Sequence, residues 1–103
     1  MSKNEPPMTR PVIFKFRLYV AGEALNATLA IANLAAICRI HLPGRHVIDV
    51  VDVFREPKRA LADGIFMTPT LIKLSPAPEQ KIVGTLSQTQ TVLLALGLPT
   101  VTE

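Results

Sequence analysis

The stretch Phe66-Met67-Thr68-Pro69-Thr70-Leu71 decides how the second half of this chain folds. Proline has no backbone N–H to give to a neighbouring strand, so Pro69 predicts the entry to a strand rather than its interior. We expect a cis bond between Thr68 and Pro69, because cis X-Pro bonds serve tight turns. The apolar run that follows predicts a strand over 70–74.

Two further strands are expected in the first half. The segment 12–20 alternates, so its large apolar side chains would point to one face and Lys15 and Arg17 to the other. The β-branched run 46–54 predicts a second strand, and its nearly continuous apolar character is typical of a central, parallel strand. A fourth strand is expected over 80–83, after a proline-rich turn.

Helices are expected between these strands. The first covers 24–40, and a short second one lies within 56–64, with proline at its start and glycine past its end. A third covers 91–96, where Ser87 and Gln90 form a capping box and Gly97 ends the helix. The resulting βαβαββα order is an α/β arrangement that resembles thioredoxin-like proteins.

Thioredoxin chemistry requires a Cys-x-x-Cys where the first helix starts, and this chain has Ala21-Gly22-Glu23-Ala24-Leu25-Asn26 there. The lone Cys38 falls in an apolar helix, which favours a buried, inert thiol. His41 and His46 lack further ligands nearby in sequence, so we interpret them as turn residues rather than a metal site. We therefore predict no catalytic residues, metal or cofactor.

The composition of the chain limits which domain organisation, partners and location are expected. The 103 residues, 49% of them hydrophobic, suit one domain over 11–98, with a flexible lead at 1–10 and a short tail at 99–103. The net charge of +3 is spread along the chain, which argues against nucleic acid. No apolar stretch is long enough for a membrane span or resembles a secretory signal, so we expect a cytoplasmic protein.

Two features indicate protein contacts. Asp49 and Asp52 would project from opposite faces of one strand; Asp52, near its carboxyl end, is either a loop cap or a partner contact. Between Ala24 and Cys38 the first helix carries no charged side chain. Such a helix is normally covered on more than one side, which favours a homo-oligomer contact over exposed alanines that simply tolerate water.

The chain resembles the KaiB family of circadian clock proteins. The resemblance rests on the following residues and motifs: Leu18-Tyr19-Val20-Ala21-Gly22, Asn26, Val51-Asp52-Val53, Pro57, Thr68-Pro69-Thr70-Leu71, Lys73, Pro76, Pro78, Ile82-Val83-Gly84 and Leu86-Ser87. It implies a non-enzymatic regulator that binds KaiC, a hexameric ATPase and autokinase, and modulates its phosphorylation cycle, with KaiA as a further partner. The alternative is a thioredoxin-like sensor module that acts on a histidine kinase or a stress-response pathway.

The resemblance also implies where partners and the conformational switch act. We expect a homo-oligomer, dimer or tetramer, and partner contacts at Val47, Asp49, Val51, Asp52, Lys73 and Lys81. KaiB proteins are known in two folds, the thioredoxin-like one and a tetrameric βαββααβ ground state, which differ in the second half of the chain. Residues expected to govern that switch are Pro69, Pro76, Pro78, Gly84, Ala95 and Gly97.

This chain departs from the family at two of these positions and in the turn at 78–81. Ala95 stands where relatives usually carry glycine, which favours helix by roughly 1 kcal/mol and predicts a larger thioredoxin-like population. Asp49 stands where relatives carry lysine, and of the basic residues across the turn at 78–81 only Lys81 remains. Changed charge at a contact changes the choice of partner. We therefore expect a divergent KaiC-like ATPase in another bacterium, in stress signalling rather than a cyanobacterial clock.

Overall fold

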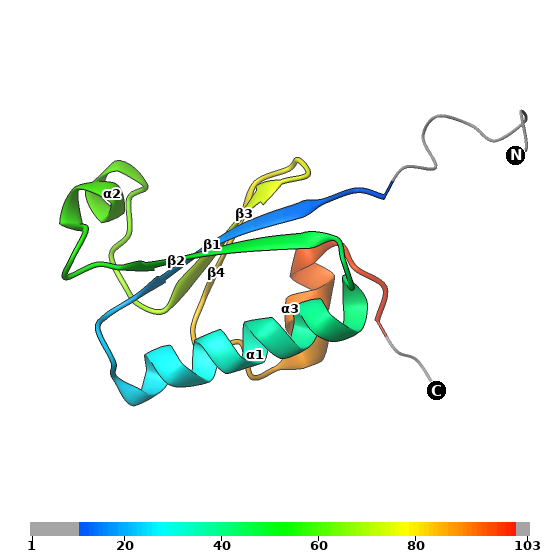
Figure 1. Ribbon diagram of the computed structural model, residues 1–103, viewed down its shortest axis with the longest axis horizontal. Helices are drawn as coiled ribbons and strands as arrows, with labels where there is room; N and C mark the ends of the chain where they lie inside the picture. Colours follow the sequence, from blue (N-terminus) through cyan, green and yellow to red (C-terminus); the bar gives the residue numbers. More distant parts are fainter. Residues whose placement is uncertain (1–10, 101–103) are drawn as a thin grey trace, which may run out of the picture.

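A computed structural model describes residues 11–100, so the expected lead at 1–10 and the end of the expected tail, 101–103, lie outside the described residues. The elements follow in the order β1 (Phe14–Val20), α1 (Leu25–His41), β2 (His46–Asp52), α2 (Pro57–Ala62), β3 (Thr70–Ser75), β4 (Gln80–Val83) and α3 (Thr89–Leu96). This is the predicted thioredoxin-like βαβαββα order (Figure 1), rather than the alternative βαββααβ order.

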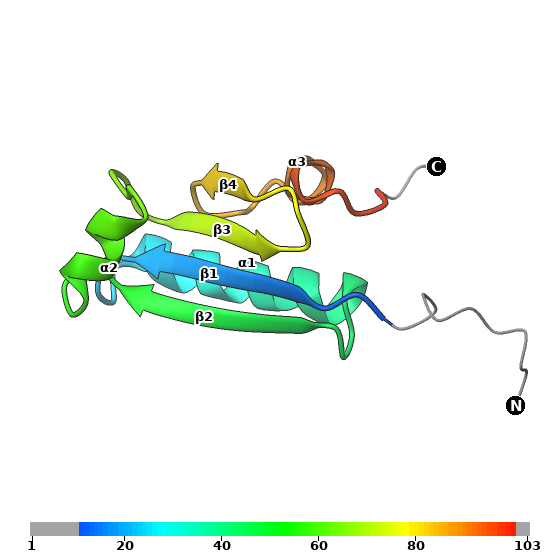
Figure 2. The same ribbon diagram turned by 90° about the horizontal axis from the view of Figure 1, so that it is seen from above.

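The four strands form one sheet in the order β2-β1-β3-β4, visible in Figure 2. β2 pairs parallel to β1, as predicted, while β3 is antiparallel to both β1 and β4. The prediction that the second strand is central is wrong, because β3 pairs with the other side of β1 and β2 has a single neighbouring strand within residues 11–100. Val47 and Val50 of this edge strand are consequently 53% and 43% exposed.

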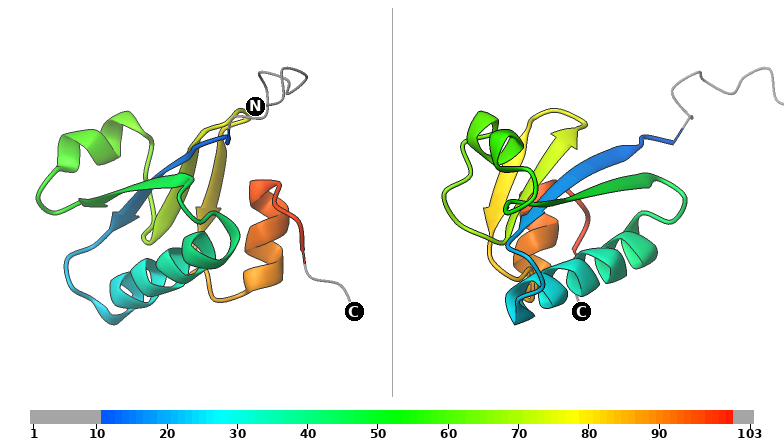
Figure 3. Two further views of the ribbon diagram at one scale, coloured as in Figure 1. Left: turned by 45° about the vertical axis from the view of Figure 1, so that its right-hand side comes forward. Right: turned by 60° about the vertical axis from the view of Figure 1, so that its left-hand side comes forward.

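Helices α1 and α3 cover one face of the sheet (Figures 1 and 3). The alternation expected in the first strand is confirmed, since its four apolar side chains all enter this layer. The main core residues are Phe14, Phe16, Leu18, Val20, Leu34, Ile37, Leu71, Leu93 and Leu96. Cys38 belongs to the same core and is fully buried, and burial raises the pKa of its thiol to about 11.

Helix α2 lies on the opposite face, over the carboxyl ends of β1 and β2 (Figure 1). A smaller apolar cluster forms beneath it from Tyr19, Val51, Ala60 and Ile72. Tyr19 is fully buried although it shares this face of β1 with Lys15 and Arg17. The helix therefore covers one end of the face and leaves the rest open.

The ends of the elements largely follow the local signals. Pro57 opens α2, and Gly97 ends α3 in the left-handed region at φ +76°, as predicted. The predicted capping box at α3 is wrong: the helix starts at Thr89, its N-cap is Gln88, and no side chain caps it. The Ser87 hydroxyl instead accepts a hydrogen bond from Thr85, so the box residues do not reach the helix N–H groups.

The expected cis bond at Pro69 is confirmed, and the bonds before Pro76 and Pro78 are also cis. Both of these later prolines lie in the predicted turn between β3 and β4. Among the described residues, no helix is long and apolar enough to cross a membrane.

Candidate partner-binding surface

A row of four paired residues, three of them charged, crosses the face of the sheet that carries α2. Backbone pairing aligns Asp49 of β2, Arg17 of β1, Ile72 of β3 and Lys81 of β4 as successive neighbours. Paired residues of adjacent strands point to the same face. The Arg17 Nε atom lies 3.3 Å from the Asp49 carboxylate, so the row begins with an ion pair between the two parallel strands.

Helix α2 is tied to this row at both of its ends. Arg59 donates to the Asp49 carboxylate, and Asp63, just past the helix, lies 3.0 Å from Arg17 Nη1. The Lys81 ammonium donates to the Asp63 carbonyl oxygen at 2.8 Å. The helix is thus joined to β1, β2 and β4 by charged groups rather than by apolar packing alone.

The Tyr19 hydroxyl completes this charged cluster by donating to the Asp63 carboxylate. Burial, reinforced by this hydrogen bond, raises the pKa of Tyr19 to about 12. The same bond, together with Arg17, lowers the pKa of Asp63 below its usual range. Hydrogen bonds from Arg59 and Arg17 lower the pKa of Asp49 likewise. Both carboxylates are therefore ionised near neutral pH, which makes them suited to holding α2 and poorly suited to proton transfer.

Three of the predicted contact residues lie at the surface of this face. Val47 is 53% exposed, the Asp49 side chain is 44% exposed, and Lys81 is exposed at the far end of the row. The outermost strand, β2, supplies two of them. The exposed positions thus lie at the two ends of the row, on the edge strand β2 and on β4, with the buried Ile72 between them.

The other three predicted contacts are placed differently. Val51 is fully buried beneath α2, so in this fold it is a core residue. Lys73 is only 4% exposed: its side chain enters the α1/α3 layer, with Nζ 3.5 Å from the Leu96 carbonyl oxygen and 5.8 Å from the Phe14 ring centroid. A partner cannot reach either side chain without opening the core.

Asp52 acts as a loop cap, one of the two readings its position allowed. Its Oδ1 atom accepts hydrogen bonds from the backbone N–H groups of Gly22 at 3.1 Å and Phe54 at 2.9 Å. The carboxylate thereby joins the ends of β1 and β2. Its negative charge accepts hydrogen bonds from nearby backbone N–H groups.

Sequence reasoning missed Arg17, Tyr19, Arg59 and Asp63 as members of a cluster. The alternation of β1 correctly places Arg17 away from the apolar core. No local signal connects it to Asp63, which is 46 residues further along the chain. The sequence signal nearest to this cluster is the position of Asp63, a charged residue directly after the short helix α2.

The position that holds the dithiol in thioredoxins is an apolar pocket here. Its volume is about 310 Å³, and it is lined by Ala21, Val53, Phe54, Ala60, Ile65, Phe66, Met67 and Thr68. Phe66 and Met67 are 93% and 61% exposed at its rim. Apart from Thr68 the side chains of this lining are apolar, so the pocket suits contact with an apolar group.

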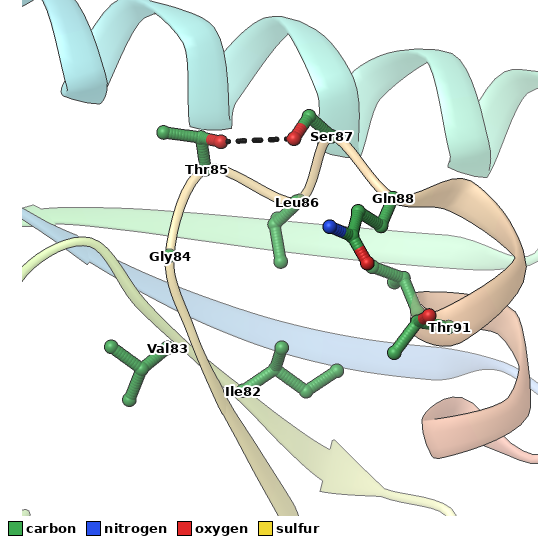
Figure 4. Close-up of a pocket in the computed structure, with 9 residues that line it drawn as sticks. Ile82, Val83, Gly84, Thr85, Leu86, Ser87, Gln88 and Thr91 are labelled. Carbon is green, nitrogen blue, oxygen red and sulfur yellow. Dashed lines mark hydrogen bonds between the residues drawn. The ribbon is translucent and has the colours of Figure 1, made fainter.

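A second pocket of about 370 Å³ lies between β4, the following loop and the start of α3 (Figure 4). Ile82 and Leu86 point into it, while Thr85, Ser87, Gln88 and Thr91 give it a polar rim. The Asn33 amide of α1 donates to the Thr85 carbonyl at 2.8 Å and thereby fastens this loop to the first helix.

No group of three or more potential metal-binding side chains forms within residues 11–100. His46 contacts the Leu42 carbonyl oxygen at 2.7 Å through Nδ1. This contact closes the turn between α1 and β2, which is the role expected from sequence.

The predicted switch residues all lie in the second half, on the segments that follow α2. Pro69, Pro76 and Pro78 occupy the two ends of β3 and the turn after it. Gly84 has φ +120° in the loop before α3, a value that side chains rarely allow. Ala95 lies within α3, and Gly97 caps it.

Comparison with known proteins places the chain in a family. The model of the KaiB domain matches residues 17–98. The circadian clock protein KaiB3 of Synechocystis sp. is 42% identical over 82 residues, 80% of each chain, and the circadian clock oscillator protein KaiB of Synechococcus elongatus is 39% identical over the same length and shares.

Solved structures agree with the fold at low sequence identity. The N-terminal domain of Synechococcus elongatus SasA superposes with a TM-score of 0.69 at 15% identity, covering 99% of this chain and 100% of that domain. Chloroplastic thioredoxin z gives a TM-score of 0.67 at 18% identity, covering 87% and 80%. The chain has a thioredoxin-like fold and belongs to the KaiB family of circadian clock proteins.

Proposed function

We propose that this protein is a non-enzymatic regulator that binds a KaiC-type hexameric ATPase and autokinase and modulates its phosphorylation cycle. Membership of the KaiB family supports this proposal most directly. The site chemistry agrees, because the carboxylates of the open face are engaged with arginines and the buried Cys38 thiol has a raised pKa. A cytoplasmic location stays a prediction of the same proposal.

The free edge of β2 is the part of the surface best suited to the partner. An edge strand presents unpaired backbone groups, and natural proteins normally protect them. β2 has seven residues and exposes two valines beside this edge. We propose that the partner covers Val47 and Asp49, with Lys81 at the margin of the contact.

A pull-down with a KaiC-type ATPase in the presence of ATP tests this surface. We expect Val47→Glu to weaken binding roughly tenfold or more, because it places a charge in a contact that excludes water. Val83→Glu is the matched control: Val83 is 54% exposed on β4, the opposite edge strand of the same sheet. Equal binding by wild type and Val47→Glu would contradict the proposed surface.

A sensor or interaction module that acts on a histidine kinase or a stress-response pathway is the second candidate. The observation that favours it is the superposition on the N-terminal SasA domain over 99% of this chain. The same two variants discriminate the candidates when the pull-down is repeated with a histidine kinase. Binding to the kinase alone would favour the second candidate, and a KaiA-like protein is a further partner to include.

A further inference from the structure

The turn between α1 and β2 carries basic side chains and no acidic ones. From Ala24 to Ile48 the chain has no acidic residue. The turn lies at the edge of the sheet, at the end of β2 that is remote from α2 (Figure 2). The side chains at this end of β1 and β2 form what we call the basic patch, which consists of Lys15, Arg39, His41, Arg45 and His46.

Hydrogen bonds hold the backbone of this turn in one conformation. The carbonyl oxygen of the fully buried Leu42 accepts from the Arg45 backbone N–H at 3.0 Å and lies 2.7 Å from His46 Nδ1. The Arg45 carbonyl in turn accepts from the Phe14 N–H at 2.8 Å, which ties the turn to β1. A partner that contacts the turn would therefore lose little free energy to ordering it.

The arginines of the basic patch have no counter-charge close by in the described chain. The ion pairs within residues 11–100 all involve one of three other arginines: Arg17, Arg55 and Arg59. Glu79 directly precedes β4, which stands three strand spacings, about 14 Å, from β2. That separation exceeds the screening length of about 8 Å at physiological ionic strength, so Glu79 does not neutralise the patch.

The end of α1 neutralises the patch only in part. The C-terminus of a helix carries about half of a negative charge, which favours basic residues in its last turn. Arg45 Nη2 accordingly lies 3.5 Å from the His41 carbonyl oxygen. The guanidinium groups of Arg39 and Arg45 each carry a full positive charge. The helix end therefore accounts for the position of one of these cations and leaves the turn positive.

Exposed apolar side chains adjoin the basic patch. Ile40, between Arg39 and His41, is 65% exposed, and Val47, directly after His46, is 53% exposed. A nucleic-acid backbone would leave these apolar groups without a partner, whereas protein contacts combine apolar and charged groups. The surface thus suits a protein segment that carries both carboxylates and apolar side chains.

We propose that the basic patch binds an acidic segment of a partner protein. Carboxylates of the segment pair with the guanidinium groups of Arg39 and Arg45, whose planar donors suit them. Apolar side chains of the segment contact Ile40 and Val47. This contact goes beyond the proposed ATPase binding, because it extends from Val47 around the edge of the sheet and depends on the chemistry of the segment rather than on which protein supplies it.

Fluorescence anisotropy of a labelled peptide of alternating glutamate and leucine residues, titrated with the full chain, tests the proposal. We expect a dissociation constant below about 1 mM at low ionic strength, and weaker binding as salt is added. A counterpart peptide with glutamine in place of glutamate keeps the leucines and should bind about tenfold more weakly.

Variants of the chain locate the contact. Arg39→Glu combined with Arg45→Glu should weaken binding about tenfold or more, because two cations become anions. Arg55→Glu combined with Lys58→Glu is the matched control: it makes the same change of net charge at exposed positions near α2 and should weaken binding less than about threefold. Arg39→Gln combined with Arg45→Gln should give an intermediate loss. Far-ultraviolet circular dichroism verifies that each variant is folded.

Four results would overturn the proposal. Equal weakening by the two glutamate double variants would indicate a general attraction by net charge. Equal binding of the two peptides would show that carboxylates are not recognised, and the absence of binding up to about 1 mM would exclude the contact. Binding of phosphatidylserine vesicles without binding of the peptide would indicate a membrane surface instead. The proposed ATPase binding would stand in each case, because a separate pull-down measures it.

Discussion

The two faces of the sheet are stabilised by different means. Within residues 11–100, the face under α1 and α3 is closed by apolar side chains, and the charged Lys73 is buried among them. The face under α2 holds only a small apolar cluster and is completed by the ion pairs of Arg17, Arg59 and their carboxylates. Apolar burial has no preferred direction, whereas ion pairs require defined partners. The packing of α2 on its face of the sheet should therefore depend more strongly on pH and salt than the packing of α1 and α3.

Lys73→Glu should give the largest effect, because it introduces an anion into the apolar face. We expect a loss of about 3–5 kcal/mol in the free energy of unfolding, since the new carboxylate would lie near the helix C-terminal carbonyl of Leu96 without a cation. Urea denaturation of wild type and variant measures the loss.

Lys81→Glu is the matched control on the open face, where the ammonium is exposed and donates to one backbone carbonyl. Its expected loss is below about 1 kcal/mol. Similar losses in the two variants would show that burial does not distinguish Lys73 from Lys81 in its effect on stability.

Asp63→Asn should give the next largest loss of stability, and it tests the ion pairs of the face under α2. The variant weakens the contacts to Tyr19 and Arg17, at a cost of about 1–2 kcal/mol for a partly exposed group. Glu56→Gln removes a helix-surface pair with Arg59 and should cost less than about 0.5 kcal/mol.

The pH dependence of the Asp63 contribution follows from its lowered pKa. A carboxyl whose pKa is lower in the folded protein stabilises the fold above its unfolded pKa of about 3.9. That stabilisation disappears as the pH falls through the folded value. The difference between wild type and Asp63→Asn should thus be largest near pH 7 and shrink below about pH 4. A constant difference across this range would show that ionisation is not involved.

Ala95→Gly should have a smaller effect on stability than Lys73→Glu or Asp63→Asn, and the clearest effect on conformation. Glycine within a helix costs about 1 kcal/mol relative to alanine, so α3 should become less stable. If this helix opposes the tetrameric fold, the variant should also increase the population of a strand over 91–96. Solution NMR of isolated wild type and variant measures this population. A strand over 91–96 in the wild-type protein would contradict the prediction that Ala95 favours the thioredoxin-like fold.

Some features of the fold were predictable because neighbouring residues determine them. The alternation of Phe14, Phe16 and Leu18 defines one buried face, and Pro57 and Gly97 mark helix ends through their own backbone restrictions. The predicted capping box does not form, and the Ser87 hydroxyl instead accepts a hydrogen bond from Thr85. Which hydrogen bond a serine hydroxyl forms depends on the local backbone geometry, and the sequence pattern alone does not predict that geometry.

The candidate surface was predictable only in part. Val47 is 53% exposed and the Asp49 side chain 44%, but Val51 and Lys73 are buried, because exposure depends on what covers each face. A β-branched run looks the same whether its strand is central or at the edge, so β2 could not be placed from its composition.

The sequence by itself determined the order of helices and strands, the apolar side of β1, the absence of the dithiol and the family resemblance. These depend on residue types and short spacings that are readable along the chain. Only the tertiary structure decided the edge position of β2, the burial of Lys73 and the joining of Arg17 to Asp63. The reason is physical: these properties arise from contacts between segments tens of residues apart, and the chain brings such segments together only when it folds.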